Sequence, residues 1–365
     1  MSRILRRPSA SSDPTDDLTP AQKRMYASEK LTNFRTIAKL CATQSTYTLT
    51  SLDLASADLY VRLAEFKQFV MMSSCALSPQ IVYANLGILM QSKFPLEGFD
   101  AIPGTSLVDA FLGTVADVPG IVVYRGHIEQ LVVGFSSTAT IKQALYDMYA
   151  IKQPYLYEKG PCIHAGFWKM YEGCRSEVLR IVHRSLQRHR VRELAIVGHS
   201  MGGALSYLFA LDVLIGDAAL SDYWQDLVNA YQATNGKGSV KEYCVKTLND
   251  GVPSLPSVSW GYKHLTRTPL YFHHGRLFNV PSSECEHGVF SVADDALDRT
   301  RRPEHPRGGH NYYNGVDAER VIRRIYWMAK LSKGTTGWEE AYLAKITEIE
   351  QAWQEDGGVA PRDVI

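Results

Sequence analysis

One junction constrains the fold of this chain more than any other feature, the run "LAIVGHSMGGALSYLFALDVL" at residues 194–214. Its first part is a short apolar run typical of a strand buried in a parallel sheet, and its second part is typical of a helix. Between them, a serine at position 200 stands between two glycines at positions 198 and 202. A plain turn needs no such arrangement, so the run predicts a strand that turns sharply into a helix.

The G-x-S-x-G pattern at this junction is typical of a nucleophile elbow. Such a turn raises the Ser200 hydroxyl above the strand ends, and the following helix directs its free amides and the positive end of its dipole toward it. The alternative is a glycine-rich turn with an incidental serine. The apolar strand before it, Gly203-Ala204 after it and the helix beyond favour the elbow.

The surrounding patterns alternate between strand and helix, which favours an α/β layered fold. "GIVVY" and "EQLVVGF" predict two strands of a hairpin joined at residues 125–128. "GPCIHAGF", "YCVKTL" and "PLYFH" predict further short strands. Helical spacing predicts helices at about residues 139–149, 167–189 and 316–331.

The chain divides into four expected regions. Residues 1–25 are polar and rich in Pro, Ser and Asp, which predicts a disordered tail. Residues 26–118 are expected to form a helical region packed on the core, because Leu59, Leu63, Phe66 and Val70 share one helical face. Residues 119–332 are the expected core, and residues 333–365 a helical C-terminal tail.

Charge and hydropathy exclude several classes of partner and location. The 39 Lys and Arg residues nearly balance the 38 Asp and Glu residues, so no basic field indicates nucleic-acid binding. No apolar run is long enough to predict a transmembrane segment. The N-terminus has no apolar signal core, so we expect a cytoplasmic or lipid-surface-associated protein, with export by another route left open.

A serine nucleophile needs a base and an orienting carboxylate. In folds built around a nucleophile elbow, the acid follows the serine in the chain and the histidine follows the acid. Local context favours Asp250, which precedes the turn-rich "GVPSLP", and His310 in the glycine-bounded "RGGHNYYNG". Composition alone leaves several candidates. They are the histidines His264, His273, His274, His287, His305 and His310, and acids that include Asp212, Asp217, Asp226, Glu242, Asp250, Asp294 and Asp295.

Four ordered motifs give the chain a family resemblance over about residues 119–330. "GHSMGGAL", "IHAGFWKMYEG", "NDGVPSLPSVSWGYKH" and "GGHNYYNGV" resemble segments of the class 3 (fungal-type) lipases, which have the α/β-hydrolase fold. The resemblance implies a mostly parallel central sheet with helices on both faces, beside the N-terminal helical extension. It also implies Ser200 as nucleophile, Asp250 as orienting acid and His310 as base.

By the same resemblance, Thr138 and the amide of Met201 form the oxyanion hole. This alignment places Ser136-Ser137 where the family has Arg-Gly, and it is favoured over "VYRGH", which would use His127. Losing one such donor typically costs about 3 kcal/mol of transition-state stabilisation. A second departure is the absence of the family's G-x-P-R signature between Ser200 and Asp250.

The implied activity is carboxylic-ester hydrolysis, with acylglycerols as the expected substrates and no cofactor or metal. The helix at about 139–149 is expected to act as a lid whose opening exposes Ile141, Leu145 and Met148 to a lipid surface; an ordinary packed helix is the alternative. Esterases of the same fold acting on phospholipid, galactolipid or feruloyl esters, and an idle binding module, also stay open. Zinc at His273, His274, Cys285 and His287 fits no ligand spacing.

Overall fold

The architecture comes from a computed structural model. It describes residues 18–27, 33–73, 78–91, 96, 98–155, 162–214, 220–256, 258–298, 300, 303–313, 316–332 and 338–355. Most of the expected tail at residues 1–25 therefore lies outside the described residues. Within the described part of that tail, α1 (Pro20–Ala27) begins at the proline, a residue that favours the first turn of a helix.

The sheet that carries the serine junction has four strands in the order β2-β3-β4-β7. They are β2 (Ser106–Leu112), β3 (Pro119–Arg125), β4 (Gln130–Phe135) and β7 (Glu193–Gly198). The expected hairpin is confirmed, because β3 and β4 pair antiparallel across a short turn at Gly126–Ile128. β4 and β7 pair parallel.

This sheet is mixed rather than mostly parallel, which differs from the expectation. β2 pairs antiparallel with β3, and β3 pairs antiparallel with β4. The physical reason is the length of the connections, since a parallel pair needs a crossover of a dozen or more residues and a three-residue turn cannot provide it.

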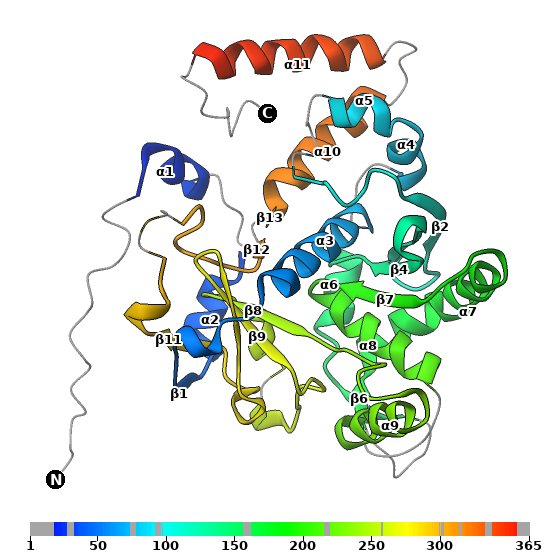
Figure 1. Cartoon of the computed structure of the whole chain (residues 1–365), viewed down its shortest axis with the longest axis vertical. Coiled ribbons are helices and arrows are strands. Elements are labelled where there is room, and N and C mark those ends of the chain that lie inside the picture. Colours follow the sequence, from blue (N-terminus) through cyan, green and yellow to red (C-terminus); the bar gives the residue numbers. More distant parts are fainter. Residues whose placement is uncertain are drawn as a thin grey trace.

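Helices cover both faces of this sheet, as expected for the fold. Alternate residues of the strands face opposite sides: Val122 and Val133 pack with α7 (Ala165–Arg188) and α8 (Met201–Leu214). Val123 and Val132 instead pack with α3 (Ala57–Ser73) and α10 (Ala318–Ser332). Figure 1 shows β7 running between α3 and α8. The serine at the end of β7 therefore lies between the two helical layers.

A second sheet, ordered β10-β9-β8, supplies the carboxylate side of the site. β8 (Cys244–Thr247) is parallel to β9 (Pro269–His273), which is antiparallel to β10 (Arg276–Asn279). Near the N-terminus, β1 (Gln44–Leu49) pairs parallel with β11 (Val289–Val292), which lies far along the chain. The N-terminal region is thus joined to the C-terminal half by backbone pairing.

The region at residues 26–118 contains both helices and strands. Its described helices include α2 (Arg35–Cys41), α3, α4 (Pro79–Ala84) and α5 (Leu86–Gln91), but β1 and β2 also lie within it. These two strands differ from the helical expectation because pairing with distant strands, rather than local spacing, stabilises them. The remaining elements are α6 (Ile141–Asp147), β5 (Lys152–Pro154), β6 (Cys162–His164), α9 (Leu220–Asn235), β12 (Tyr312–Tyr313), β13 (Val316–Asp317) and α11 (Trp338–Glu355).

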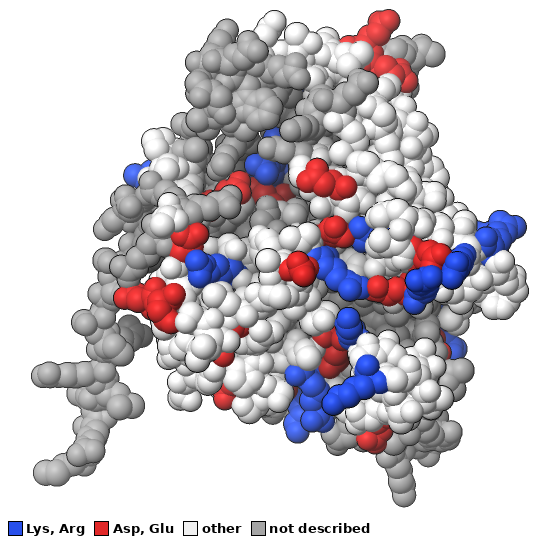
Figure 2. Space-filling view, viewed as in Figure 1, with Lys and Arg blue, Asp and Glu red and all other residues white. Residues whose placement is uncertain are grey.

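The surface agrees with the balanced composition. On the face shown in Figure 2, Lys and Arg side chains lie beside Asp and Glu rather than in one continuous basic area. Among the described helices, none has the length and apolar character needed to cross a bilayer.

Candidate active site

The serine junction forms a tight elbow between β7 and α8. Ser200 has a φ of 58°, a left-handed conformation that non-glycine residues rarely adopt. A Cβ on Gly198 would lie 2.0 Å from the carbonyl oxygen of Gly202, and a Cβ on Gly202 would lie 2.4 Å from that of Phe135. Both glycines are therefore required by close backbone approach, and the predicted sharp turn from strand to helix is confirmed.

The predicted acid and histidine are in direct contact. His310 Nδ1 lies 2.9 Å from Asp250 Oδ2 and donates to it, which leaves Nε2 free to accept a proton. Asp250 also accepts from the Val252 amide at 2.9 Å and from the Tyr313 hydroxyl. The Asp250 side chain is fully buried, and these donors satisfy its carboxylate in place of water.

Ser200, Asp250 and His310 line one cavity of about 2750 Å³. Among the described residues, no hydrogen bond links the Ser200 hydroxyl to His310. Bonds of this kind are commonly long in a site without substrate and shorten when the substrate is bound. The structure thus brings the three predicted residues to one cavity, with the acid–histidine contact already formed.

Neighbours on several sides fix the position of His310. The His199 ring stacks on it with centroids 4.3 Å apart, and His199 Nε2 donates to the His310 carbonyl at 2.9 Å. Phe34 meets the His310 ring edge-on at 5.4 Å, and the Asn33 carbonyl accepts from the His310 amide at 3.0 Å. Sequence reasoning missed Asn33 and Phe34, because nothing in their local pattern indicates a partner so far along the chain.

Burial lowers the pKa of His199 well below its ordinary value, and the positive charges of Lys67 and His310 lower it further. A neutral His199 can donate through Nε2 and stack without adding charge to the site. His199 therefore both packs on His310 and bonds to its backbone.

Both predicted oxyanion-hole residues line the same cavity. Thr138 follows β4, and its hydroxyl donates to Asp147 at 2.6 Å. Burial raises the pKa of Asp147, and the bond from Thr138 opposes that rise. Met201 is the first residue of α8, so its amide has no acceptor within the helix.

The alternative oxyanion position lies elsewhere. His127 is an exposed residue of the turn between β3 and β4. Its neighbour Arg125 is buried and pairs with Glu65 at 2.7 Å and with Gln130 at 3.0 Å. The Arg-Gly sequence at this place therefore turns the chain, as the preferred alignment predicts.

The predicted lid helix is α6, which ends at Asp147 rather than near residue 149. Leu145 is 59% exposed and Met148 is 71% exposed, so no opening is needed to expose them. This corrects the expectation that lid movement uncovers these side chains. The side chain of Ile141 lies outside the described residues. Leu145 is exposed because it lies on the solvent side of the short helix, and Met148 follows the last helical residue.

A second group of exposed apolar residues lies on the segment that follows Asp250. Trp260 is 64% exposed, and Leu255 and Val258 are also exposed. Met148, Leu255 and Trp260 all line the cavity. We call Met148, Leu255, Val258 and Trp260 the apolar rim.

Comparison with known proteins gives a family match for part of the chain. Residues 132–260 match the family described as "Lipase (class 3)". A lipase of Rhizopus niveus is 22% identical over 212 residues, covering 56% of this chain and 53% of the relative. A lipase of Rhizomucor miehei is 26% identical over 175 residues, covering 45% of this chain and 48% of the relative. This part of the chain is similar to the class 3 lipases. The aligned part spans only about half the length of these relatives.

Solved structures show the same fold. The nonglycosylated LIP2 lipase of Yarrowia lipolytica superposes with a TM-score of 0.53 at 14% identity, covering 76% of this chain and 99% of that one. Thr138, Ser200 and Asp250 lie inside the residues 132–260 that match the class 3 lipase family. His310, Lys67 and the Asn33–Phe34 segment lie outside them.

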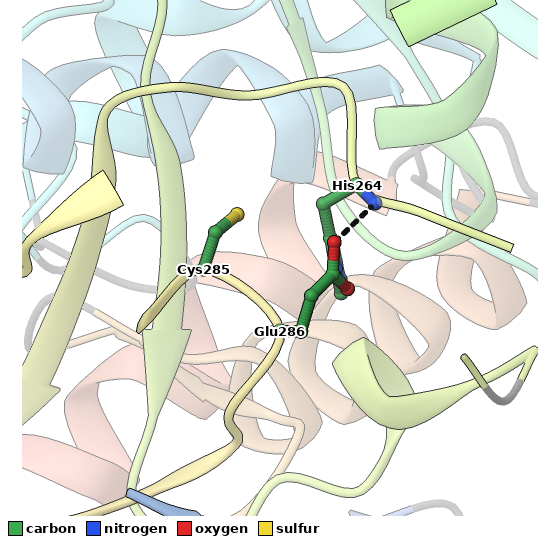
Figure 3. Close-up of side chains that lie close together, drawn as sticks. All are labelled: His264, Cys285 and Glu286. Atoms are coloured by element: carbon green, nitrogen blue, oxygen red, sulfur yellow. Dashed lines mark hydrogen bonds and ion pairs between the residues drawn. The ribbon is translucent and has the colours of Figure 1, made fainter. Parts of the chain in front are cut away.

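One group in the described part of the chain has side chains of metal-ligand type: His264, Cys285 and Glu286, drawn in Figure 3. Their ligand atoms lie within 4.8 Å of one another. Glu286 accepts from His264 Nδ1 at 2.6 Å and from the His264 amide at 3.1 Å. Cys285 donates to the Thr266 carbonyl, and burial raises its thiol pKa to about 12. The protein's own hydrogen bonds therefore account for the group.

The four residues considered for zinc from the sequence do not share a centre. His273 and His274 pack ring against ring with centroids 4.0 Å apart, and His274 Nε2 donates to the Pro306 carbonyl. His287 bonds to Thr43 at 2.9 Å. Of the four, only Cys285 belongs to the group in Figure 3.

Proposed function

We propose that the protein is a serine carboxylic-ester hydrolase that cleaves acylglycerols through an acyl-enzyme on Ser200. One observation carries the proposal. A serine in a strained elbow opens onto the same cavity as a buried Asp250–His310 hydrogen-bonded pair. A nucleophile, a base and an orienting carboxylate are the three groups that acyl transfer requires.

The first half of the reaction forms the acyl-enzyme. His310 Nε2 takes the Ser200 hydroxyl proton as Oγ attacks the ester carbonyl carbon. Asp250 holds the imidazole through Nδ1 and offsets the positive charge that forms. The carbonyl oxygen becomes an oxyanion against the Thr138 and Met201 amides. His310 then returns the proton to the leaving alcohol, and the tetrahedral intermediate collapses.

The second half releases the acid. Water attacks the acyl carbon while His310 accepts its proton, and the proton then passes to Ser200 Oγ as the bond to the acyl group breaks. No step needs a redox change or a metal-bound nucleophile. The ester is therefore converted to a carboxylic acid and an alcohol with the enzyme unchanged.

The choice of an acylglycerol substrate rests on the family and on the surface around the cavity. The relatives from Rhizopus niveus and Rhizomucor miehei are named lipases. The exposed apolar rim, with Leu145 beside it on α6, could enter the boundary region of a lipid surface. We propose that the protein contacts lipid surfaces transiently through this rim, with the cavity mouth facing the lipid.

Ester hydrolysis by the wild type and by Ser200→Ala tests the proposal, with p-nitrophenyl esters of short and long chain and emulsified diacylglycerol as substrates. Ser239→Ala is a matched control, because Ser239 is exposed and lines the same cavity. We expect turnover by the wild type and Ser239→Ala, and a loss of at least about 10³-fold in Ser200→Ala. A fluorophosphonate should add covalently to Ser200 alone.

The outcomes separate the alternatives. Turnover confined to short soluble esters would favour an esterase over a lipase. No turnover and no covalent labelling of the wild type would favour a binding module. Equal turnover by the wild type and Ser200→Ala would overturn the proposed nucleophile.

A further inference from the structure

The catalytic cavity contains a buried lysine that the proposed mechanism does not use. Lys67, on α3, is only 6% exposed and lines the cavity. Its Nζ has no hydrogen-bond partner among the described residues. A buried ammonium without hydrogen bonds is costly, so its place beside the site calls for a physical explanation.

The surroundings of Lys67 connect it to the triad. Its Nζ lies 5.5 Å from the centre of the Tyr313 ring, and the Tyr313 hydroxyl donates to Asp250. The negative charge of Asp250 stabilises the ammonium, and the ammonium disfavours protonation of His199. Tyr313, whose ring lies under the ammonium, also meets the His310 ring edge-on with centroids 6.3 Å apart, and His199 stacks on His310 at 4.3 Å.

Several charged groups on α3 and on the helix packed against it pair with groups of opposite sign. On α3 itself, Arg62 pairs with Glu193 of β7, and Glu65 pairs with Arg125 of β3 at 2.7 Å. On α10, which also packs on α3, Arg323 pairs with Glu319 at 3.5 Å. Asp250 is therefore the carboxylate whose charge acts on Lys67 most directly.

We propose that Lys67 is a positioning residue for the catalytic base: its buried ammonium beside Tyr313 and Asp250 opposes a second positive charge on His310 and keeps that imidazole able to accept a proton in mildly acidic solution. This inference rests on the role proposed for His310 and extends it. Like charges at short range disfavour each other's ionised forms, which is the physical basis of the effect.

The repulsion between Lys67 and a protonated His310 acts only below about neutral pH. Burial lowers the pKa of Lys67 to about 7, so the side chain is charged below that pH and largely neutral above it. Replacing Lys67 should therefore change the site in acid solution and leave it little changed in alkaline solution.

The test follows the ring protons of His310 by NMR from about pH 4 to about pH 9, with the signals assigned from His310→Gln. In Lys67→Met, we expect the midpoint of the His310 titration to rise by about one pH unit. Lys67→Arg keeps the positive charge and should restore the wild-type midpoint. Lys152→Met is the matched control, because Lys152 also lies over a tyrosine ring, at 5.0 Å from Tyr262, but is exposed.

A midpoint in Lys67→Met within about 0.2 pH units of the wild type would overturn the inference, as would equal shifts in Lys67→Met and Lys152→Met. In ester hydrolysis, the acid limb of kcat/KM should move with the NMR midpoint. If the midpoint moves but no ester is turned over, the proposed activity fails and the electrostatic role of Lys67 stands.

A second measurement covers the case in which Lys67→Met does not fold. Lysine labelled with ¹³C at Cε lets Lys67 be titrated directly in the wild type and in Asp250→Asn. We expect the Lys67 midpoint to fall by at least about half a pH unit when the neighbouring carboxylate is removed. An unchanged midpoint would overturn the inference without any substitution at position 67.

Discussion

The ring of His199 stacks on the ring of His310 at 4.3 Å, and the same His199 donates a hydrogen bond to the His310 carbonyl. The residue just before the elbow serine therefore supports both the side chain and the backbone of the proposed base. These two contacts of His199 hold His310 near Ser200, although the two residues are 110 positions apart in the chain.

His199→Phe keeps a stacking ring and removes the hydrogen bond. Since one hydrogen bond contributes about 1 kcal/mol, we expect kcat to fall about fivefold to tenfold with little change in KM. Steady-state kinetics with a soluble ester checks this. His189→Phe is the control, because His189 packs on the Tyr124 ring at 4.4 Å and does not line the cavity. Equal losses in both variants would contradict the role of His199.

Gly202→Ala and Gly203→Ala form a matched pair at the start of α8. A Cβ at Gly202 would lie 2.4 Å from a carbonyl oxygen, whereas a Cβ at Gly203 would lie 3.6 Å from the Gly198 carbonyl oxygen. We expect Gly202→Ala to lower the free energy of unfolding by about 3 kcal/mol, because rigid backbone must move. Gly203→Ala should be neutral or raise it by up to about 1 kcal/mol, since alanine favours helix. Chemical denaturation measures both, and similar values would contradict the packing argument.

Stability should depend on pH through Lys67. Burial lowers its pKa from 10.5 to about 7, so between these values the unfolded chain binds a proton that the folded chain does not. Burying the charged Lys67 therefore lowers the free energy of unfolding, and this cost is fully present below pH 7. As pH rises from about 7 to about 10.5 the cost disappears, so the free energy of unfolding increases by at most about 1.4 kcal/mol per pH unit.

Lys67→Met should remove this slope and be more stable than the wild type at pH 7. Guanidinium unfolding at several pH values measures the difference, with Lys152→Met as the control. If the free energy of unfolding differs between the wild type and the variant by the same amount across this pH window, burial does not lower the pKa of Lys67.

The apolar rim should bind lipid surfaces. Met148→Ser combined with Trp260→Ser is expected to reduce binding to phosphatidylcholine vesicles at least about tenfold, because the two side chains together lose about 2 kcal/mol or more of apolar transfer energy. Vesicle co-sedimentation measures the change. Leu112→Ser is the control, since Leu112 is 63% exposed on β2 and does not line the cavity. Equal binding by all three proteins would exclude the rim as the lipid contact.

Local patterns predicted the elements around the serine well. The glycines of the elbow, the β3–β4 hairpin and α7 follow from turn chemistry and hydrophobic spacing, which act between near neighbours. The mixed order of the sheet depends on connection length, and the strands β1 and β2 depend on partners that local spacing does not identify.

The N-terminal part of the site could not be predicted from the sequence. Asn33 contacts His310 and Asn311, and Lys67 faces a tyrosine near the other end of the chain. Contacts across such separations leave no local periodicity. The pairing of Asp250 with His310 was favoured from loop context and from the family resemblance, and the 2.9 Å contact agrees with it.

The contacts of Asn33 and Phe34 with His310 have a practical consequence. A shortened chain that begins at residue 119 would keep each motif of the lipase family and still lack these two side chains. Its histidine would keep the contacts with Asp250 and His199 but lose those with Asn33 and Phe34, so trimming the protein to its recognisable portion would weaken the support of the proposed base.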